Sequence, residues 1–323
     1  GLHEMIYGMK DHVNNSNDVI DEFSKLIFME TFRLHHSDYR LTQGNVAGKL
    51  LNDIYRYEYV EQHKDNAVQE IREAFKEVKE SADYVAILDN GEKSNIFSKD
   101  EYLKLENPNI YIAVLKALQD LGPININGIE RPATLRDLTG DVLGRVFDVL
   151  LRGKFENKGG MGIYLTPREV TEAASEMVLH DLTKDGAAKL ISKDSNGIPT
   201  LRIGDLCCGS AGFLIKMLQK IEYYLLNKLT GDKKQYEELF EQLKEHSFIG
   251  ADNSPGMILK ARINMALHGA PKCPIFQTRN SLTNTGLESG TFDAILTNPP
   301  FSGNGISKTI KKGKTKVENP EGV

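Results

Sequence analysis

The stretch Leu201-Arg-Ile-Gly-Asp-Leu-Cys-Cys-Gly-Ser-Ala-Gly-Phe213 decides the fold of this chain. It begins as a buried strand, passes through a glycine-rich turn and enters a helix whose apolar residues recur at helical spacing, at Phe213, Met217, Ile221 and Leu225. The glycines do not follow the G-x-G-x-x-G spacing of a dinucleotide site, and no lysine follows them as in a P-loop. The turn therefore resembles half of a dinucleotide-type site but need not hold a pyrophosphate.

Two strands of this kind end in an acidic residue. Asp205 ends the first, where a phosphate would be repelled and an amine attracted. S-adenosylmethionine, which carries an ammonium and a sulfonium group, is a ligand of suitable charge. The second strand, Phe248–Asp252, ends in a carboxylate at a position typical of an acid that binds ribose hydroxyls.

A third apolar strand, Phe292–Thr297, leads directly into Asn298-Pro-Pro-Phe301. Prolines have no backbone N–H, so this segment offers an incoming amine only acceptors, namely the Asn298 side-chain oxygen and the Pro299 carbonyl. Asparagine is neutral and would orient the amine rather than deprotonate it. Stacking on Phe301 is worth about 1–3 kcal/mol per base, comparable with the few kcal/mol needed to take a base out of a duplex.

Helices dominate the sequence before residue 153, and strands alternate with helices after residue 201. Helices are predicted over about 16–34 and over Thr134–Leu151. A third is predicted in a charged segment, with Val68, Ile71, Phe75 and Val78 on its buried face. A short extended piece is predicted at Ile124–Ile129. The fold class is therefore α/β. An N-terminal all-helical domain (residues 1–152, for partner and DNA contacts) precedes a Rossmann-like, mostly parallel sheet (residues 153–323).

Composition narrows the function classes. A net charge of −5 argues against a protein that coats nucleic acid, although the lysines of 308–316 could form a phosphate-contacting loop or a solvated one. Three cysteines and eight histidines show neither disulfide nor metal-site spacing, so no metal is expected. No membrane span or secretion signal is present, which predicts a cytoplasmic protein.

The motifs resemble those of amino-directed DNA methyltransferases. Asp205–Phe213 resembles their D-P-x-C-G-S-G-G pattern, Asn298-Pro-Pro-Phe301 their N-P-P-[FY] motif, and Gly162-Ile-Tyr-Leu-Thr-Pro167 their G-E-F-Y-T-P element. This order is that of the gamma group, and with helices before it the chain looks most like the modification subunit of a type I restriction-modification system. The resemblance implies adenine-N6 methylation of double-stranded DNA, with separate specificity and restriction subunits as partners.

The resemblance also assigns site residues. Asn298, Pro299, Pro300 and Phe301 would be catalytic. Thr166 and Pro167 would flank the methionine end of S-adenosylmethionine, Asp205 and Gly209 its amino-acid moiety, Asp252 the ribose and Asn280 the adenine. The remaining cofactor-binding positions are Tyr164, Cys208, Ser210, Gly212, Phe213 and Ser281.

The chain departs from the family pattern at Leu165, Leu206, Ala211, Asp252 and Asn280, from which we expect retuned cofactor binding. It also contains fewer strands than the family's sheet, so the sheet is expected to be incomplete at its C-terminus. Two other functions stay open: methylation of protein glutamine or RNA amines, and an assembly module that holds cofactor without activity.

Overall fold

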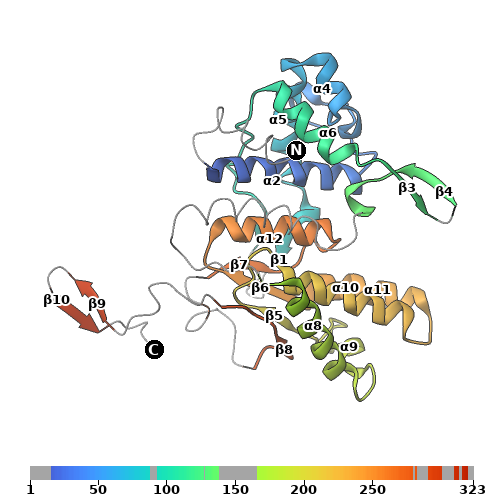
Figure 1. Ribbon diagram of the computed structural model, residues 1–323, viewed down its shortest axis with the longest axis vertical. Coiled ribbons are helices and arrows are strands. Elements are labelled where there is room, and N and C mark those ends of the chain that lie inside the picture. The colour runs from blue at the N-terminus through green and yellow to red at the C-terminus, as the bar shows by residue number, and fades with distance from the viewer. Residues whose placement is uncertain are drawn as a thin grey trace.

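The structure is a computed structural model that describes residues 16–87, 93–126, 128–137, 166–278, 281, 290–299, 309–312 and 315–318. Figure 1 shows an N-terminal helical region stacked on a C-terminal region built around a sheet. Within the described residues, no helix is both long and apolar enough to cross a membrane.

The described residues of the N-terminal region form the helices α2 (Ser16–His35), α3 (Leu51–Ile54), α4 (Tyr57–His63), α5 (Asp65–Val78) and α6 (Pro108–Gln119). Short 3-10 turns lie between or after them at Gly44–Val46, Ala82–Tyr84 and Leu135–Asp137. The predicted apolar face of α5 is confirmed, because Val68, Ile71, Phe75 and Val78 are all buried. The helix predicted over Thr134–Leu151 begins as the 3-10 turn, and its remainder lies outside the described residues.

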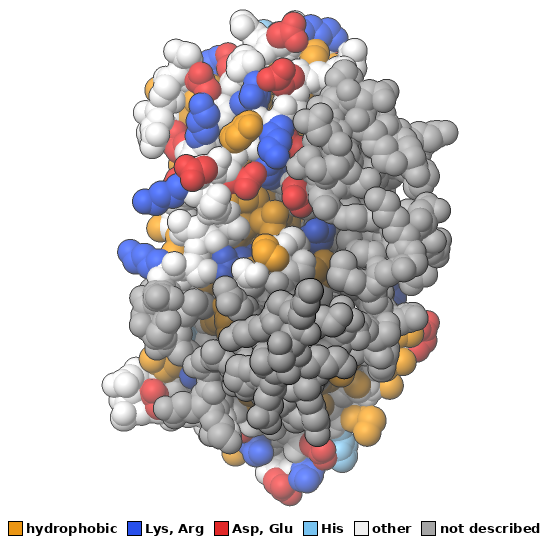
Figure 2. Space-filling model, turned by 90° about the vertical axis from the view of Figure 1, so that its left-hand side faces the viewer, with side chains coloured by type: hydrophobic (Ala, Val, Ile, Leu, Met, Phe, Trp, Pro, Cys, Tyr) orange, Lys and Arg blue, Asp and Glu red, His pale blue; other side chains and the backbone are white. Residues whose placement is uncertain are grey.

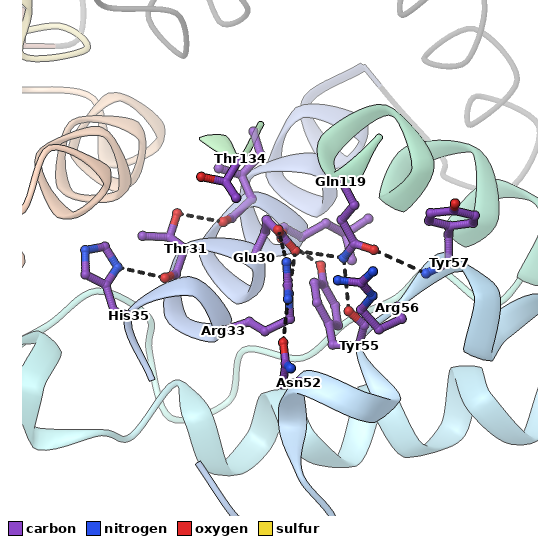
Figure 3. Close-up of polar contacts among 12 residues, drawn as sticks. Glu30, Thr31, Arg33, His35, Asn52, Tyr55, Arg56, Tyr57, Gln119 and Thr134 are labelled. Atoms are coloured by element: carbon purple, nitrogen blue, oxygen red, sulfur yellow. Dashed lines mark hydrogen bonds and ion pairs between the residues drawn. The ribbon is translucent and has the colours of Figure 1, made fainter. Parts of the chain in front are cut away.

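A buried polar cluster ties three of these helices together (Figure 3). Glu30 of α2 is 1% exposed and accepts hydrogen bonds from Arg33 and from Gln119 of α6. Arg33 also donates to Asn52 of α3, and Gln119 also donates to the Tyr55 carbonyl. Buried charged groups are tolerated when they are paired in this way, so the cluster fixes how α2, α3 and α6 pack.

The prediction that the N-terminal region is all-helical needs a correction, because two short antiparallel hairpins interrupt the helices. One pairs β1 (Val85–Ile87) with β2 (Lys93–Asn95), and the other pairs β3 (Pro123–Ile126) with β4 (Ile129–Pro132). The second lies at the predicted extended piece and projects from the helices in Figure 1. Its turn forms because Gly128 has a φ of +85° and donates its N–H to the Asn125 side chain.

The C-terminal region contains the predicted parallel sheet, which confirms the fold class. Strands β5 (Ile203–Asp205), β6 (Phe248–Asp252), β7 (Ile275–Gln277) and β8 (Ala294–Ile295) are arranged in the order β7-β6-β5-β8, all parallel. The helices around it are α8 (Arg168–Thr183), α9 (Ala188–Ile191), α10 (Gly212–Asn227), α11 (Lys233–His246) and α12 (Pro255–Leu267). A further hairpin pairs β9 (Thr309–Lys312) with β10 (Thr315–Glu318).

Strand β8 is shorter than the apolar run that predicted it. Main-chain hydrogen bonds nevertheless keep β8 aligned with β5 at both of its ends. Before the strand, Asp293 donates to the Arg202 carbonyl, and after it, Leu296 donates to the Gly204 carbonyl. Strand order reverses between β5 and β8, because β6 and β7 lie on one side of β5 and β8 lies on the other. In open α/β sheets ligands bind at the carboxyl ends of the strands next to such a switch point.

Helix α12 packs between the two regions (Figure 1). Its Met257, Ile263 and Ala266 belong to the apolar core of the N-terminal region, whereas Ile258, Ala261 and Met265 belong to the core of the sheet. Most residues of α12 are buried, including the polar Lys260, Arg262 and Asn264, because the helix is covered from both regions. The predicted division between 1–152 and 153–323 stays a prediction, since residues 138–165 lie outside the described part.

Figure 2 shows one face of the molecule, with acidic and basic side chains mixed over the helical region. The described residues on that face form no area of a single charge. The charges on this face therefore do not indicate a basic groove for nucleic acid. The side chains of the lysine-rich segment 308–316, for which a phosphate-contacting loop was one interpretation, lie outside the described residues.

Candidate functional site

Three polar residues meet at one edge of the sheet because three parallel strands end there. Asp205 is the last residue of β5, Asp252 is the last residue of β6, and Asn298 follows shortly after β8. Parallel strands point their carboxyl ends the same way, so residues separated by some 90 positions in sequence are brought to one place. The hydrogen bonds described below link these three strand ends directly.

The turn after β5 is held in a tight, left-handed form. Gly209 has a φ of +52° and Ala211 a φ of +70°, and Ala211 is the N-cap of α10. The Cys208 N–H donates to the Ala251 carbonyl of β6 at 2.9 Å, and the Ala211 N–H donates to the Cys208 carbonyl at 2.7 Å. A left-handed conformation is strained for alanine and readily adopted by glycine, which is the residue that the family pattern has in place of Ala211.

Asp205 is a buried acid in this turn, with only 2% of its surface exposed. Burial raises the pKa of its carboxyl to about 7, and the negative charge of Asp252 adds to the rise. Hydrogen bonds from the Thr297 side chain and the Cys207 N–H act in the opposite direction on the same pKa. A cation that binds beside a buried carboxyl stabilises its ionised form, because the positive charge offsets the cost of burying the negative one.

Asp252 fastens the second strand to the turn and to the next helix. One carboxylate oxygen accepts the Gly209 N–H at 3.0 Å, and the other accepts the Ser254 N–H, at the N-cap of α12, at 2.9 Å. Each carboxylate oxygen can accept more than one hydrogen bond. Asp252 can therefore keep both protein contacts and still accept from ligand hydroxyls.

Asn298 lies close to the glycine turn. The preceding residue, Thr297, accepts the Cys207 N–H with its hydroxyl oxygen at 3.1 Å, which joins the end of β8 to the turn after β5. The Asn298 side-chain nitrogen donates to the Thr166 hydroxyl oxygen at 3.0 Å. The segment ahead of α8, the glycine turn and the Asn-Pro segment thus meet at one site.

The segment Thr166-Pro-Arg-Glu169 has capping-box spacing, which predicts that Thr166 caps a helix, but Thr166 does not cap α8. The N-cap is Pro167 rather than Thr166, the helix begins at Arg168, and no side chain caps it. The hydroxyl that would have bonded to the helix N-terminus accepts from Asn298 instead. Sequence reasoning gave no role to Thr297 and Cys207, whose contact is visible only once β5 and β8 are known to be neighbours.

The other predicted cofactor-binding residues lie in or near the turn. Cys208 and Phe213 are buried in the core of the sheet, so any contact that they make with a ligand would come from their main chain. The Ser210 carbonyl accepts from Asn264, and Ser281 donates its hydroxyl to the Leu206 carbonyl. Gly212 is the first residue of α10. Tyr164, Asn280, Pro300 and Phe301 lie outside the described residues, whereas Pro167 and Pro299 are described and exposed.

The site is built without clustered metal ligands in the part of the chain that the structure describes. No group of three or more His, Cys, Asp or Glu side chains there could hold a metal ion. All three cysteines are free thiols, and burial raises the pKa of the Cys208 thiol well above its usual value. A thiol of this kind stays protonated and packs as a small apolar group.

Comparison with known proteins identifies the family. The family profile described as N-6 DNA Methylase matches residues 138–321, more than half of the chain. The type II methyltransferase M.MamI of Microbacterium ammoniaphilum is 28% identical over 307 residues, which are 94% of this chain and 74% of that protein. The type I restriction enzyme MjaIX methylase subunit of Methanocaldococcus jannaschii is 26% identical over 164 residues, 50% of this chain and 23% of that subunit.

A solved structure shares the fold. A modification subunit of a putative type I restriction enzyme from Vibrio vulnificus YJ016 superposes with a TM-score of 0.51 at 16% identity. The match covers 94% of this chain and 60% of that subunit, so the chain spans less than two thirds of its length. The resemblance seen in the motifs is confirmed by the profile match, which contains both the glycine turn and Asn298. The chain belongs to the N-6 DNA methylase family.

Proposed function

We propose that this chain transfers a methyl group from S-adenosylmethionine to the N6 amine of adenine in double-stranded DNA. We further propose that it acts in the cytoplasm as the modification subunit of a type I restriction-modification system, together with specificity and restriction subunits. The family match supports the reaction class. The observation that carries the proposal is the 3.1 Å hydrogen bond between Cys207 and Thr297, because it holds Asn298 beside the glycine turn.

The residues at the turn fit S-adenosylmethionine. Asp205 is a buried carboxyl that an ammonium group would stabilise in its charged form, and the turn at Gly209 lets the main chain approach a ligand closely. Asp252 keeps acceptor capacity for ribose hydroxyls, and Thr166 and Pro167 lie on the Asn298 side of the site. The cofactor would supply a methyl group on a positively charged sulfur.

The chain's own residues would bind and orient the target amine. The Asn298 side-chain oxygen and the Pro299 carbonyl would each accept one N–H of the adenine amine, leaving its lone pair directed at the methyl group. Asparagine does not take the proton, so its contribution is orientation. Pro300 offers no competing donor, and Phe301 would stack on the base. These roles follow the family motif at positions 298–301.

The direct test is the methylation state of DNA. DNA from cells that carry the intact gene should contain N6-methyladenine after digestion and mass analysis, and DNA from cells that carry Asn298→Ala should lack the same sites. Purified wild-type protein should transfer labelled methyl groups to DNA from a gene-deleted strain. Wild-type cells without N6-methyladenine, or an active Asn298→Ala variant, would refute the proposal.

The same experiment separates the two alternative functions. Label that enters protein or RNA rather than DNA would favour a glutamine or RNA amine methyltransferase. Cofactor binding without transfer to any acceptor would favour an assembly module. Nothing in the comparisons favours either alternative, and the named relatives are DNA methyltransferases and restriction-enzyme subunits.

A further inference from the structure

The side chains of Asn298 and Thr166 are in contact although they are 132 positions apart in sequence. The Asn298 amide nitrogen donates to the Thr166 hydroxyl oxygen at 3.0 Å, and both residues are half-buried. We propose that Thr166 is a positioning residue for methyl transfer, which holds the Asn298 amide so that its oxygen faces the target amine. This inference rests on the proposed function, and it assigns Thr166 a role other than cofactor binding.

The chemistry of an amide explains why a partner for its nitrogen matters. The nitrogen end of the asparagine side chain only donates hydrogen bonds, and the oxygen end only accepts them. A target amine is a donor, so it requires the oxygen end. The nitrogen end then faces the opposite way and needs an acceptor, which the Thr166 hydroxyl oxygen provides. Donation to Thr166 also polarises the amide and strengthens its oxygen as an acceptor.

Thr166 is well placed to hold the amide because the helix behind it is anchored. It lies one residue before the N-cap of α8, and the Pro167 carbonyl accepts both the N–H and the hydroxyl of Thr171. Helix α8 packs along α10, and Lys220 of α10 pairs with Glu172 of α8 at 2.5 Å. Helix α10 starts at the glycine turn, so Thr166 and that turn share one rigid support.

Asn298 is therefore fixed from two directions. Thr297 fixes the main chain through its bond with the Cys207 N–H, and Thr166 fixes the side chain. Removal of the Thr166 hydroxyl would leave the main chain in place and take this hydrogen bond away from the amide. A displacement of about 1 Å at reacting groups can lower a rate about a hundredfold, so loss of this bond is expected to slow transfer without changing the cofactor contacts.

Thr166→Val tests this role because valine keeps the shape of threonine and removes the hydroxyl. Thr166→Ser keeps the hydroxyl. Thr171→Val is the matched control, since it makes the same change one turn into α8, where the hydroxyl contacts only the helix's own Pro167 carbonyl among the bonds described above. Each variant of the full-length methylase is assayed for S-adenosylmethionine affinity by calorimetry, and for single-turnover transfer to DNA from a gene-deleted strain.

Thr166→Val is expected to transfer methyl groups about ten to a hundred times more slowly than wild type at saturating cofactor. Its cofactor dissociation constant should stay within about threefold of wild type, because the hydroxyl orients Asn298 and does not contribute to cofactor binding. Thr166→Ser and Thr171→Val should both transfer at nearly the wild-type rate.

Two results would overturn the inference while leaving the proposed function intact. One is wild-type transfer by Thr166→Val. The other is a defect in Thr166→Val that disappears at high cofactor concentration, which would assign the hydroxyl to cofactor binding, as the sequence predicted. Wild-type protein that places no methyl group on adenine would instead refute the proposed function, and the role of Thr166 would fail with it.

Discussion

Replacement of Asp205 by asparagine should remove most of the pH dependence of cofactor binding between pH 5 and 7. The carboxyl is 2% exposed, and burial raises its pKa to about 7 in the free protein. An ammonium group bound beside it favours the charged form, so binding releases a proton from any molecule in which Asp205 is protonated. Affinity should therefore rise with pH until the free carboxyl is fully ionised.

The magnitude follows from the fraction of Asp205 that is ionised before binding. With a pKa of about 7, roughly half of the molecules carry the charge at pH 7, about 9% at pH 6 and about 1% at pH 5. If only the charged form binds well, affinity falls about fivefold from pH 7 to pH 6 and about ninefold more from pH 6 to pH 5. Above pH 7 the remaining gain is about twofold.

Titration calorimetry of S-adenosylmethionine in two buffers of different ionisation enthalpy measures both the affinity and the number of protons released. Wild-type protein should release close to one proton per cofactor at pH 6, and Asp205→Asn should release none from this position. Asparagine keeps the shape of the side chain and can still accept the Cys207 N–H with its oxygen. A wild-type affinity that is flat from pH 5 to 7, or an equally steep Asp205→Asn profile, would refute this reasoning.

The sign for stability is the reverse of the sign for binding. The pKa of Asp205 is raised from 3.8 to about 7 on folding, so the folded state holds its proton more tightly and stability declines as pH rises from about 4 to 7. Above pH 7 the full cost, at most roughly 4 kcal/mol, is present. Asp205→Asn should therefore unfold at higher denaturant concentration than wild type at pH 8, with a smaller difference at pH 5.

Three other substitutions, the first with a matched control, test the packing around the site by denaturant unfolding. Gly204→Ala should destabilise by about 1–3 kcal/mol, because its methyl group would lie 2.6–2.9 Å from three ring atoms of Phe292, whereas Gly212→Ala meets no atom within 4 Å and should have little effect. Ala211→Gly should change stability by less than about 1 kcal/mol, since relief of left-handed strain, about 1–2 kcal/mol, is offset by a lost buried methyl group and greater chain entropy. A larger loss would show that the methyl group is needed. Arg262→Met should cost roughly 2–3 kcal/mol, because this buried side chain donates to acceptors on β2 and β7; an unchanged stability would mean that the contact is unimportant.

The sequence predicts the sheet and the site's strand ends well because both depend on local patterns. Apolar runs that end in Asp205 and Asp252 lie on β5 and β6, and the glycine turn leads into α10 as expected. Helix periodicity likewise places α2 and α5 correctly. These features are encoded in spacing along a short segment, so they can be read without knowledge of the fold.

The contacts that complete the site depend on distant pairs and could not be read from spacing. Thr166 has the sequence pattern of a helix cap. A hydroxyl in this position can either cap the helix or accept a hydrogen bond from Asn298, and the local sequence does not distinguish the two roles. The hairpin of β1 and β2 was missed, and only a short extended piece was predicted where β3 and β4 lie, because strands of three or four residues are too short for their periodicity to be distinguished from loops. The strand that positions Asn298 has only two residues and depends on β5 for its register.

Helix α12 links the N-terminal helices to the edge of the sheet at Asp252, so a structural change in one is expected to move the other. Its first turn follows Asp252, which accepts hydrogen bonds from both Gly209 and Ser254, and its Met257 and Ile263 pack in the N-terminal core. Arg262, further along the same helix, donates to the carbonyl of Asn95 and to that of Ile275 in the sheet. A shift of the N-terminal helices would therefore move the start of α12 and the carboxylate expected to bind ribose. Packed interfaces transmit displacements. If a partner or DNA binds the helical region, as the sequence predicts, it would therefore change cofactor affinity through this helix.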